Sequence, residues 1–237
     1  MKTIYQDILT AKSEGKKLLA ILLDPDKINR NKWSVLIAKI KNSGATHIFV
    51  GGSIVAENLT EKLVENLKRE IHLPIILFPG DFTQLTTKAD AVLFLSLLSG
   101  RNPEYLIGQH IKAAPLLKKT MLEVIPTSYL LIESGKQTTV ARVSQTQPID
   151  RNNINLIVNT AQAGELLGHK LTYLEAGSGA EIPVSGEIIK TVSQALSIPL
   201  IVGGGIRSKK QMETAYNSGA DLVVIGTAFE ENFDFFE

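Results

Sequence analysis

The 237-residue sequence predicts an α/β fold in which eight parallel strands close into a barrel. Eight apolar runs of strand length recur along the chain, and amphipathic helical patterns separate most of them. Near-continuous apolar strands that alternate with such helices indicate a parallel sheet covered on both faces, and eight repeats favour a (β/α)8 TIM barrel. With 44% hydrophobic residues, the chain suits one domain spanning residues 1–237.

The expected elements follow one another in a regular order. The strands are predicted at residues 18–23, 47–50, 75–78, 91–97, 121–125, 171–174, 200–202 and 222–225. The helices are predicted at residues 32–41, 57–69, 103–117, 153–167, 185–196 and 209–217. Residues 1–17 precede the first strand and are typical of a short amphipathic helix.

Two units depart from this regularity. Residues 79–89 are too few for a full crossover helix between the third and fourth strands, so the third helix is predicted to be irregular or missing. An elongated apolar groove is expected at that gap. After the fifth strand, residues 127–152 include the polar segment 134–148, which we interpret as a functional loop or oligomer contact that is partly mobile.

Composition excludes several classes of function. The formal net charge of +1 and the lack of a basic run argue against a nucleic-acid partner. The absence of cysteine excludes disulfides and thiolate metal sites. The N-terminus has no apolar signal core, and no apolar run approaches the ~20 residues that span a bilayer. A cytoplasmic protein with no transmembrane segment is expected.

The segment LTYLEAGSGA, residues 171–180, carries the strongest chemical signal. Its strand ends at the carboxylate Glu175, and small residues follow, which let backbone N–H groups approach an anion. A carboxylate beside an anion is unfavourable unless it acts on a hydroxyl of the same molecule. Tyr173 and Glu175 alternate on the strand and therefore share a face. We interpret Glu175 as a candidate base and Tyr173 as a substrate hydrogen-bond partner.

The last two strands predict the rest of a phosphate cup. They end in Gly203-Gly204-Gly205 and in Gly226-Thr227, and a helix is expected after each. Phosphate commonly binds at these two loops of a barrel, where N–H groups converge. The alternative is a pair of tight turns without a ligand, which three consecutive glycines at a strand end do not favour. The cup by itself does not identify a reaction.

A metal site is predicted at the ends of the first two strands. Asp24 in DPDK and Ser53 in GGS follow neighbouring parallel strands, which lie ~4.8 Å apart. Hard oxygen ligands of this kind suit Mg²⁺ bridged to a diphosphate. Asp26 is interpreted instead as the N-cap of the first helix after this strand, and the alternative for Asp24 is a simple turn residue.

The remaining polar and aromatic positions have structural interpretations. Glu123 lies in an apolar strand and is expected to pair with a lysine or arginine inside the barrel. Asn102 is expected to cap the next helix, while Tyr105 either packs or closes the far end of the apolar groove, and Arg101 is placed where it could face a diphosphate. The four histidines have no metal-ligand spacing.

In order along the chain, these segments resemble the geranylgeranylglyceryl phosphate synthase family, which includes the bacterial heptaprenylglyceryl phosphate synthases of the PcrB type. The segments are LLDPDK, FVGGS, FLSLLSGRNPEYLIGQH, EVIPTSYLLIESG, YLEAGSGA, IVGGGIRS and VVIGTAFE. The match covers nearly the whole domain, and YLEAGSG combined with GGGIRS is highly specific. The resemblance implies a Mg²⁺-dependent prenyltransferase that joins a prenyl diphosphate to the sn-3 hydroxyl of sn-glycerol 1-phosphate and releases diphosphate.

The resemblance also implies site residues. Glycerol 1-phosphate would be bound by Tyr173, Leu174, Glu175, Ala176, Gly177, Ser178, Gly179, Gly204, Gly205, Gly226 and Thr227. Asp24 and Ser53 would bind Mg²⁺, and Glu175 would assist deprotonation of the attacking hydroxyl. Leu22 stands where the PcrB branch has lysine, and AGSG stands where that branch has YSG. Both departures favour the geranylgeranyl type over the heptaprenyl type.

Rival interpretations remain at this level. The chain could be another phosphate-binding barrel enzyme that acts on a phosphosugar and needs no apolar groove, or a phosphate-sensing barrel without activity. The expected partners are glycerol 1-phosphate, a prenyl diphosphate, transiently a membrane, and a second copy of the chain in a homo-oligomer.

Overall fold

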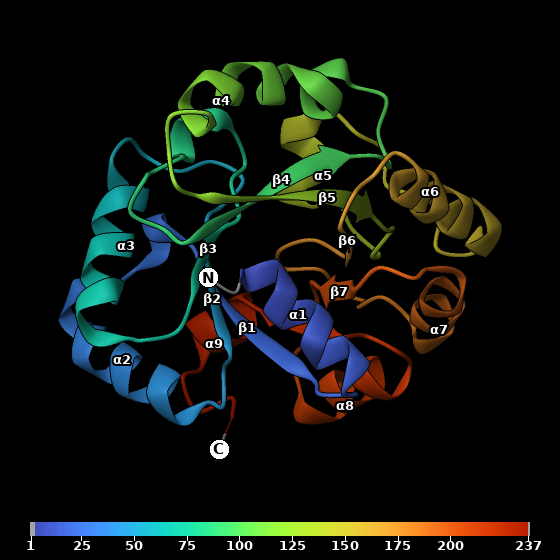
Figure 1. Ribbon diagram of the computed structural model, residues 1–237. Coiled ribbons are helices and arrows are strands. Elements are labelled where there is room, and N and C mark those ends of the chain that lie inside the picture. Colours follow the sequence, from blue (N-terminus) through green and yellow to red (C-terminus); the bar gives the residue numbers. More distant parts are fainter. Residues whose placement is uncertain (1–2, 237) are drawn as a thin grey trace.

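The computed structural model, which describes residues 3–236, confirms the predicted barrel. Each strand pairs in parallel with the next in chain order, and β8 returns to β1 to close the sheet (Figure 1). The strands are β1 (Leu18–Leu23), β2 (His47–Val50), β3 (Ile75–Leu77), β4 (Ala91–Leu97), β5 (Glu123–Leu131), β6 (Leu171–Glu175), β7 (Leu200–Gly203) and β8 (Leu222–Ile225).

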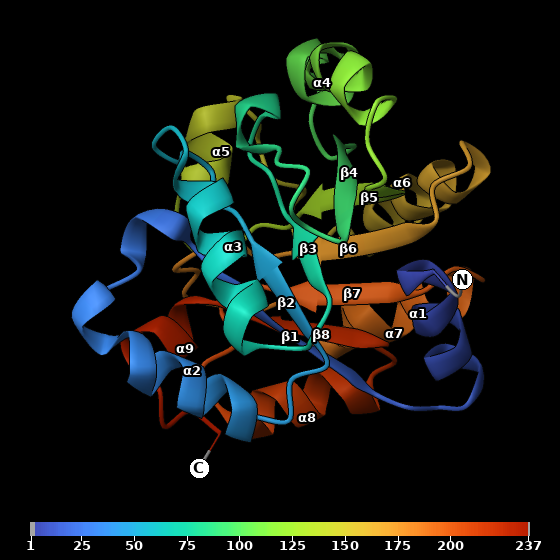
Figure 2. The same cartoon turned by 60° about the vertical axis from the view of Figure 1, so that its left-hand side comes forward.

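Helices surround the barrel on its outside (Figures 1 and 2). They are α1 (Ile4–Ser13), α2 (Trp33–Asn42), α3 (Leu59–Glu70), α4 (Gln109–Leu117), α5 (Thr139–Ser144), α6 (Ile154–Leu166), α7 (Gly186–Ala195), α8 (Lys209–Asn217) and α9 (Thr227–Glu231). None of those formed by residues 3–236 has the length and apolar character needed to cross a bilayer. Cytoplasmic location and self-association stay predictions.

Alternation along the strands produces two apolar layers. Residues such as Phe49, Tyr129 and Tyr173 point inward and fill the barrel, while residues such as Val50, Leu130 and Leu174 point outward and pack under the helices. This follows from the two-residue period of a strand, which places successive side chains on opposite faces. The inner layer therefore forms the floor on which any site at the strand ends is built.

Helix α1 lies across the N-terminal end of the barrel, in front of the strands in Figure 1. Glu123, at the start of β5, accepts hydrogen bonds from the backbone N–H groups of Ile4 (2.6 Å) and Tyr5 (3.0 Å). Among residues 3–236, no lysine or arginine pairs with Glu123, so the predicted ion pair is not seen in the described part of the chain. The first N–H groups of a helix lack intrahelical acceptors, and here two of them donate to this carboxylate.

The gap in the helical ring is confirmed. Between β3 and β4 the chain forms only a single 3-10 turn, Phe82–Gln84, in place of a crossover helix. Asp81 caps this turn through its carboxylate, which accepts the N–H of Thr83 at 2.7 Å. Because no helix covers β3 and β4 at this end, the space beside these strands is left to α4.

Strand β5 differs from its predicted bounds of residues 121–125. It runs from Glu123 to Leu131, and Met121 is fully exposed. Thr127 and Ser128 lie beyond the predicted end, yet both are buried within the strand. The Thr127 hydroxyl donates to the carbonyl of Ile125 (2.9 Å), and the Ser128 hydroxyl pairs with Nδ1 of His169 (2.6 Å). Pairing with β4 and β6 therefore sets the length of β5.

The polar segment 134–148 is not a loop throughout. It contains helix α5, and the side chain of Thr138 accepts the N–H of Ala141 at 3.4 Å to cap it. The Asn102 amide donates to the carbonyl of Ser144 at 2.9 Å, which ties α5 to the segment after β4. The same Asn102 side chain accepts the N–H of Glu104 at 3.0 Å, so its predicted capping role is confirmed.

Candidate active site

Glu175 lies at the end of β6 that faces away from α1. Its neighbours across the sheet are Leu131 on β5 and Gly203 on β7. Two ladder hydrogen bonds fix its backbone: the N–H of Ile132 donates to its carbonyl (2.8 Å), and the next N–H, of Ala176, donates to Gly203 (3.0 Å). The strand period turns the Glu175 side chain to the barrel interior, and the carboxylate is positioned by the sheet rather than by a loop.

Burial dominates the electrostatics of Glu175. The side chain is only 5% exposed. Removal from water raises the pKa of Glu175 to about 7, and the backbone N–H of Gly177, which donates to Oε1 at 2.6 Å, opposes part of that rise. The nearby Tyr173 hydroxyl acts in the same direction as Gly177. A carboxyl group with a pKa near neutrality exchanges a proton readily at physiological pH.

Tyr173 lies two residues before Glu175 on β6 and shares its inward face, as predicted. Its ring stacks on Phe78 with centroids 5.4 Å apart and meets the edge of Tyr129 at the same separation. Burial, together with the charge of Glu175, raises the pKa of Tyr173 well above 10. Its buried hydroxyl has no well-formed hydrogen bond among the described residues. That hydroxyl is a donor available to a bound molecule.

Four glycines form the predicted cup, and each has a backbone conformation that is unfavourable for residues with a Cβ. Gly177, Gly179, Gly204 and Gly205 all have positive φ, between 70° and 101°. Close approach adds a second constraint: a Cβ on Gly204 would lie 2.2 Å from Oε1 of Glu175. At the cup's edge, the hydroxyls of Ser178 and Thr227 are 3.2 Å apart, and Gly226 precedes Thr227 at the start of α9.

Two residues of the predicted binding segment lie elsewhere. The side chains of Leu174 and Ala176 point into the outer apolar layer under the helices, and neither lines the pocket. The N–H of Ala176 is already bonded to Gly203 within the sheet. Strand alternation explains this placement, because inward Tyr173 and Glu175 force their neighbour Leu174 outward. Contiguity in sequence made these two positions look equivalent to their neighbours.

The predicted metal residues lie on the opposite wall of the same pocket. Asp24 and Ser53 both line it, and a Cβ on Gly52 would lie 3.0 Å from Oδ1 of Asp24. Among residues 3–236 no cluster of three or more acidic or histidine side chains could hold a metal. Mg²⁺ commonly uses only one or two carboxylates, with water and substrate phosphates completing its shell. The hard oxygens of Asp24 and Ser53 fit that ion.

The predicted N-cap role of Asp26 is wrong, because Asp24 caps the turn that follows β1. Asp24 accepts the N–H of Asp26 at 3.2 Å and thereby caps the 3-10 turn Pro25–Lys27. Asp26 accepts the N–H of Ala56 at 3.3 Å and does not cap that turn. Pro25 has no N–H to offer, so the first available donor after Asp24 is Asp26 itself. One oxygen of Asp24 thus has a local partner while its side chain still faces the pocket.

Sequence patterns missed an ion-pair group beside Asp24. Lys27 Nζ lies 3.1 Å from Oε2 of Glu230 and 3.5 Å from Oδ2 of Asp24. The other oxygen of Glu230 accepts the N–H of Asp24 at 3.0 Å. Arg207 lines the pocket as well and pairs with Glu231 at 3.6 Å. Lysine in DPDK was a possible signal for the first pair, but only the fold brings α9 to β1.

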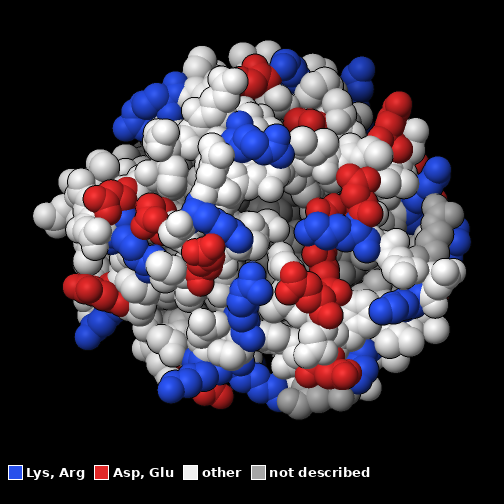
Figure 3. Space-filling view, turned by 180° about the vertical axis from the view of Figure 1, so that it is seen from behind, with Lys and Arg blue, Asp and Glu red and all other residues white. Residues whose placement is uncertain are grey.

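The central pocket has a volume of about 290 Å³. Figure 3, which views the molecule from behind, shows basic and acidic side chains around a hollow on the face opposite α1. An apolar groove adjoins the pocket, and both share Gly52, Ser53, Phe78, Tyr129 and Val140 as walls. The groove runs beside β3 and β4, where the helix is missing.

Helix α5 and α4 complete the groove. Val140 and Val143 of α5 line one side, and Gln109, His110 and Ala113 of α4 line the other. Tyr105 also lines it, and its hydroxyl donates to the carbonyl of Val143 at 3.4 Å. The Arg101 guanidinium instead donates to the carbonyls of Leu98 (3.1 Å) and Gly100 (2.7 Å) and is exposed. The predicted orientation of Arg101 toward a diphosphate is therefore not seen.

Comparison of the whole sequence with known proteins points to one group. Residues 12–236 match the PcrB family. The chain belongs to the PcrB family. A geranylgeranylglyceryl phosphate synthase of Flavobacterium johnsoniae is 60% identical over 237 residues, covering 100% of this chain and 98% of the relative. One from Thermococcus kodakarensis is 42% identical over 221 residues, covering 93% and 87%.

A solved structure from the same group has nearly the same shape. The crystal structure of (S)-3-O-geranylgeranylglyceryl phosphate synthase from Thermoplasma acidophilum, in complex with its substrate sn-glycerol-1-phosphate, superimposes with a TM-score of 0.93 at 32% identity. The alignment covers 100% of this chain and 96% of that one. The resemblance inferred from the motifs is confirmed, and this PcrB family member shares the barrel of that structure.

Proposed function

We propose that this PcrB family member is a prenyltransferase of the geranylgeranylglyceryl phosphate synthase type. It joins a prenyl diphosphate, in the first place geranylgeranyl diphosphate, to the sn-3 hydroxyl of sn-glycerol 1-phosphate and releases diphosphate. One observation carries the proposal: the buried carboxylate of Glu175 lies at the edge of a glycine-walled cup that opens into an apolar groove. A small phosphate ester and a long lipid both find a complementary surface there.

Glycerol 1-phosphate is placed with its phosphate in the cup. The backbone of Gly177, Gly179, Gly204 and Gly205 allows close approach, and the Ser178 and Thr227 hydroxyls offer donors at the edge. Gly226 leaves the start of α9 open beside them. The glycerol part then extends toward Glu175 and the buried hydroxyl of Tyr173, which makes no well-formed hydrogen bond among the described residues. This placement accounts for a carboxylate beside an anion, because the two groups contact opposite ends of one molecule.

Glu175 accepts the proton of the attacking hydroxyl. The bond from the glycerol oxygen to the allylic carbon forms as the bond from that carbon to the diphosphate oxygen breaks, and the proton moves to the Glu175 carboxylate. With a pKa of about 7, the carboxylate is a stronger base than an exposed glutamate, and about half of it is ionised at neutral pH. The apolar groove keeps water from the developing cationic carbon.

Asp24 and Ser53 are the residues that would hold Mg²⁺ in this scheme. The ion, when bound, supplies positive charge to the leaving diphosphate. Asp24 is held ready by the Asp26 N–H at one oxygen, while Lys27 and Glu230 fix the neighbouring backbone and charge. Lys27 and Arg207 are the basic side chains that line the pocket among the described residues. Their positive charge suits a pocket that takes a phosphate from one substrate and a diphosphate from the other.

The prenyl tail is assigned to the groove beside β3 and β4. Its walls include Phe78, Phe94, Val140 and Ala113, so the apolar surface continues from the pocket toward the outside. This observation counts against the phosphosugar alternative, since a sugar phosphate would leave the groove unused. The names of the relatives favour geranylgeranyl over heptaprenyl chains. A homo-oligomer stays a prediction that no contact here bears on.

The product identifies the reaction. The protein is incubated with Mg²⁺, glycerol 1-phosphate and a mixture of prenyl diphosphates of different lengths, and the products are measured by mass spectrometry. A prenylglyceryl phosphate dominated by the geranylgeranyl chain is expected, and no ether product would overturn the proposal. A thermal-shift series with glycerol 1-phosphate, phosphosugars and a prenyl diphosphate distinguishes this function from the phosphosugar alternative. The alternative requires that a sugar phosphate alone stabilises the protein.

A further inference from the structure

The outer face of α4 is unusually apolar for a surface helix. Ile107, in the π-helical turn Glu104–Gly108 that leads into α4, is 55% exposed, and Ile111 one turn later is 65% exposed. Leu116 near the end of the helix is 41% exposed, and Pro115 beside it is also exposed. Surface helices normally direct such residues to the core. This face directs them to the outside.

After Glu104, the charges along this helix have one sign. Between Glu104 and Glu123 the only charged side chains are Lys112, Lys118 and Lys119. Lys112 is paired with Glu104 and lies over the ring of Phe82 at 5.7 Å. Within residues 3–236, Lys118 and Lys119 make no ion pair, and both are exposed. A helix with apolar residues and lysines on its accessible surface is typical of segments that lie in the lipid interface.

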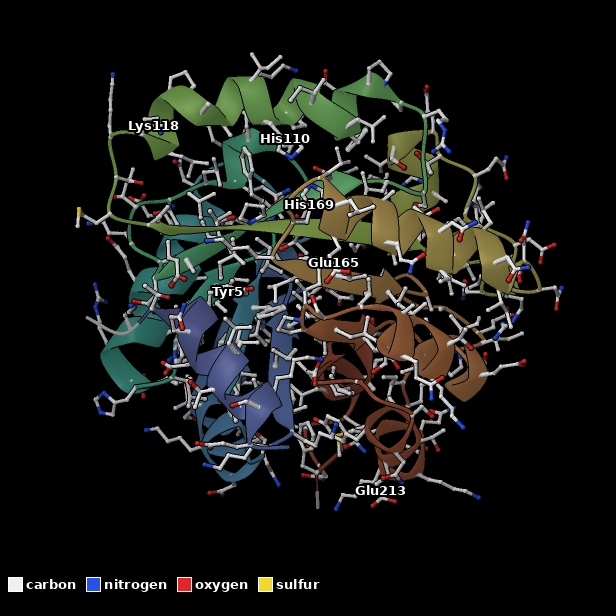
Figure 4. The ribbon with its side chains drawn as sticks, turned by 45° about the vertical axis from the view of Figure 1, so that its right-hand side comes forward. Tyr5, His110, Lys118, Glu165, His169 and Glu213 are labelled. Carbon is white, nitrogen blue, oxygen red and sulfur yellow. The ribbon has the colours of Figure 1, made fainter. Side chains whose placement is uncertain are left out.

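The opposite face of α4 forms a wall of the groove. Gln109, His110 and Ala113 line the groove, while Ile107 and Ile111 do not. In Figure 2, α4 stands out from the rest of the ribbon, and in Figure 4 His110 lies on the barrel side of α4 while Lys118 lies at its outer end. One helix thus separates the groove from the exposed apolar face, and Phe82, 39% exposed, lies at the groove beside it.

We propose that the outer face of α4, formed by Ile107, Ile111, Lys118 and Lys119, docks reversibly on an anionic bilayer. Docking would bring the groove to the surface in which a long prenyl tail is dissolved, so the inference rests on the proposed function for its purpose. Lipid binding itself needs no catalysis. A membrane with anionic headgroups matches both the isoleucines, which enter the acyl boundary, and the lysines, which stay among the headgroups.

Charge favours this occupant over a second copy of the chain. A two-fold contact uses the same patch on both subunits. A dimer centred on α4 would therefore place four lysines, Lys118 and Lys119 of each copy, in one contact, and the acidic residue that begins this helical segment, Glu104, is already paired with Lys112. Such like-charge juxtaposition is unfavourable, whereas an anionic lipid surface neutralises the same lysines.

Vesicle flotation tests the inference without substrate. The full-length protein is mixed with phosphatidylcholine vesicles that contain or lack phosphatidylglycerol. Binding to the anionic vesicles that weakens with added salt is expected. The variant Ile107→Ser/Ile111→Ser should bind at least about tenfold more weakly, because two isoleucines lose their apolar burial. Lys118→Glu/Lys119→Glu should lose the preference for phosphatidylglycerol.

A matched control removes equally exposed apolar residues elsewhere. Leu166 and Leu167 at the end of α6 are 88% and 72% exposed, so Leu166→Ser/Leu167→Ser should bind vesicles like the wild type. Turnover of a short, water-soluble prenyl diphosphate should be the same in the wild type and in all three variants, which shows that the fold and active site are intact. If the wild type shows no such turnover, the proposed function is refuted, whereas the docking proposal is not affected.

Three outcomes would overturn the docking proposal. In the first, the wild type fails to float with anionic vesicles, and in the second, the Ile107→Ser/Ile111→Ser variant floats as well as the wild type. In the third outcome, sedimentation shows that the Ile107→Ser/Ile111→Ser change converts a dimer into a monomer, which would assign this face to a second copy of the chain.

Discussion

The backbone N–H of Gly177 donates a 2.6 Å hydrogen bond to Oε1 of Glu175, two residues earlier in the chain. This bond joins the phosphate cup to the candidate base. It also fixes one oxygen of the carboxylate and leaves the other for the substrate. Burial raises the pKa of Glu175 to about 7, and this hydrogen bond offsets part of that rise.

Replacing Glu175 by Gln should preserve the fold and lower turnover. Gln keeps an oxygen acceptor for the Gly177 N–H but cannot take a proton. General bases contribute roughly 100- to 10,000-fold, and a loss of that size in kcat is expected. Binding of glycerol 1-phosphate, measured by calorimetry, should change little. A variant with normal turnover would remove Glu175 from the mechanism.

The pH dependence of stability should reveal the buried carboxyl group. The pKa of Glu175 is raised in the folded state from 4.5 to about 7, so the folded protein holds a proton that the unfolded chain has lost in that interval. Stability from this group is full below pH 4.5 and falls as the pH rises to about 7, by roughly 3 kcal/mol in all. Urea unfolding of the wild type and Glu175→Gln across this range measures the difference, which should be constant above pH 7. A difference that does not vary with pH would contradict the raised pKa.

Gly204→Ala should disable the cup. Gly204 has φ +79°, and the added Cβ would lie 2.2 Å from Glu175 Oε1 and 2.6 Å from the Gly177 nitrogen. Gly44 is a matched control, because its φ is +74° and nothing lies within 4 Å of an added Cβ. Gly44→Ala should cost only the backbone strain of roughly 1–2 kcal/mol. Calorimetry should show loss of glycerol 1-phosphate binding in the first variant and not in the second.

Asp24→Asn should raise the Mg²⁺ concentration that the reaction requires. Even outer partners of metal ligands alter affinity by roughly 10- to 100-fold, so loss of a direct ligand should raise the Mg²⁺ concentration for half-maximal activity at least about tenfold. Asp26→Asn removes a neighbouring carboxylate that instead accepts the Ala56 N–H, and it should leave that concentration unchanged. Mn²⁺ binding followed by electron paramagnetic resonance gives a readout independent of turnover. Equal effects of the two changes would argue against Asp24 as the ligand.

Ala113→Phe should shorten the groove. Ala113 is buried in the groove wall, so a ring there would occupy space assigned to the tail. The cost of such overpacking should lower kcat/KM for geranylgeranyl diphosphate by roughly tenfold or more. The value of kcat/KM for a short prenyl diphosphate should not change. Ala114→Phe, on the same helix but outside the groove wall, is the control. Product lengths measured by mass spectrometry distinguish the two.

Local sequence was sufficient for much of the fold. Apolar runs such as residues 18–23 and 222–225 have the period and length of buried parallel strands, and the short segment between β3 and β4 has no room for a helix. The glycines of GGG and AGSG indicate the cup because their small size acts at the position where they stand. These signals are local, so a single sequence is enough to carry them.

Tertiary contacts decided the rest. β5 extends through Thr127 and Ser128 because strands on both sides pair with it and because His169, 41 residues away, satisfies the Ser128 hydroxyl. Leu174 leaves the pocket since its neighbours on β6 face inward, while Glu230 reaches Lys27 from 203 residues away. Closure of the barrel supplies these neighbours. A residue's charge, burial and partners depend on groups that are distant in sequence, so the sequence by itself determined the barrel and the cup, whereas the pKa of Glu175, the ion pairs and the walls of the groove were decided only by the fold.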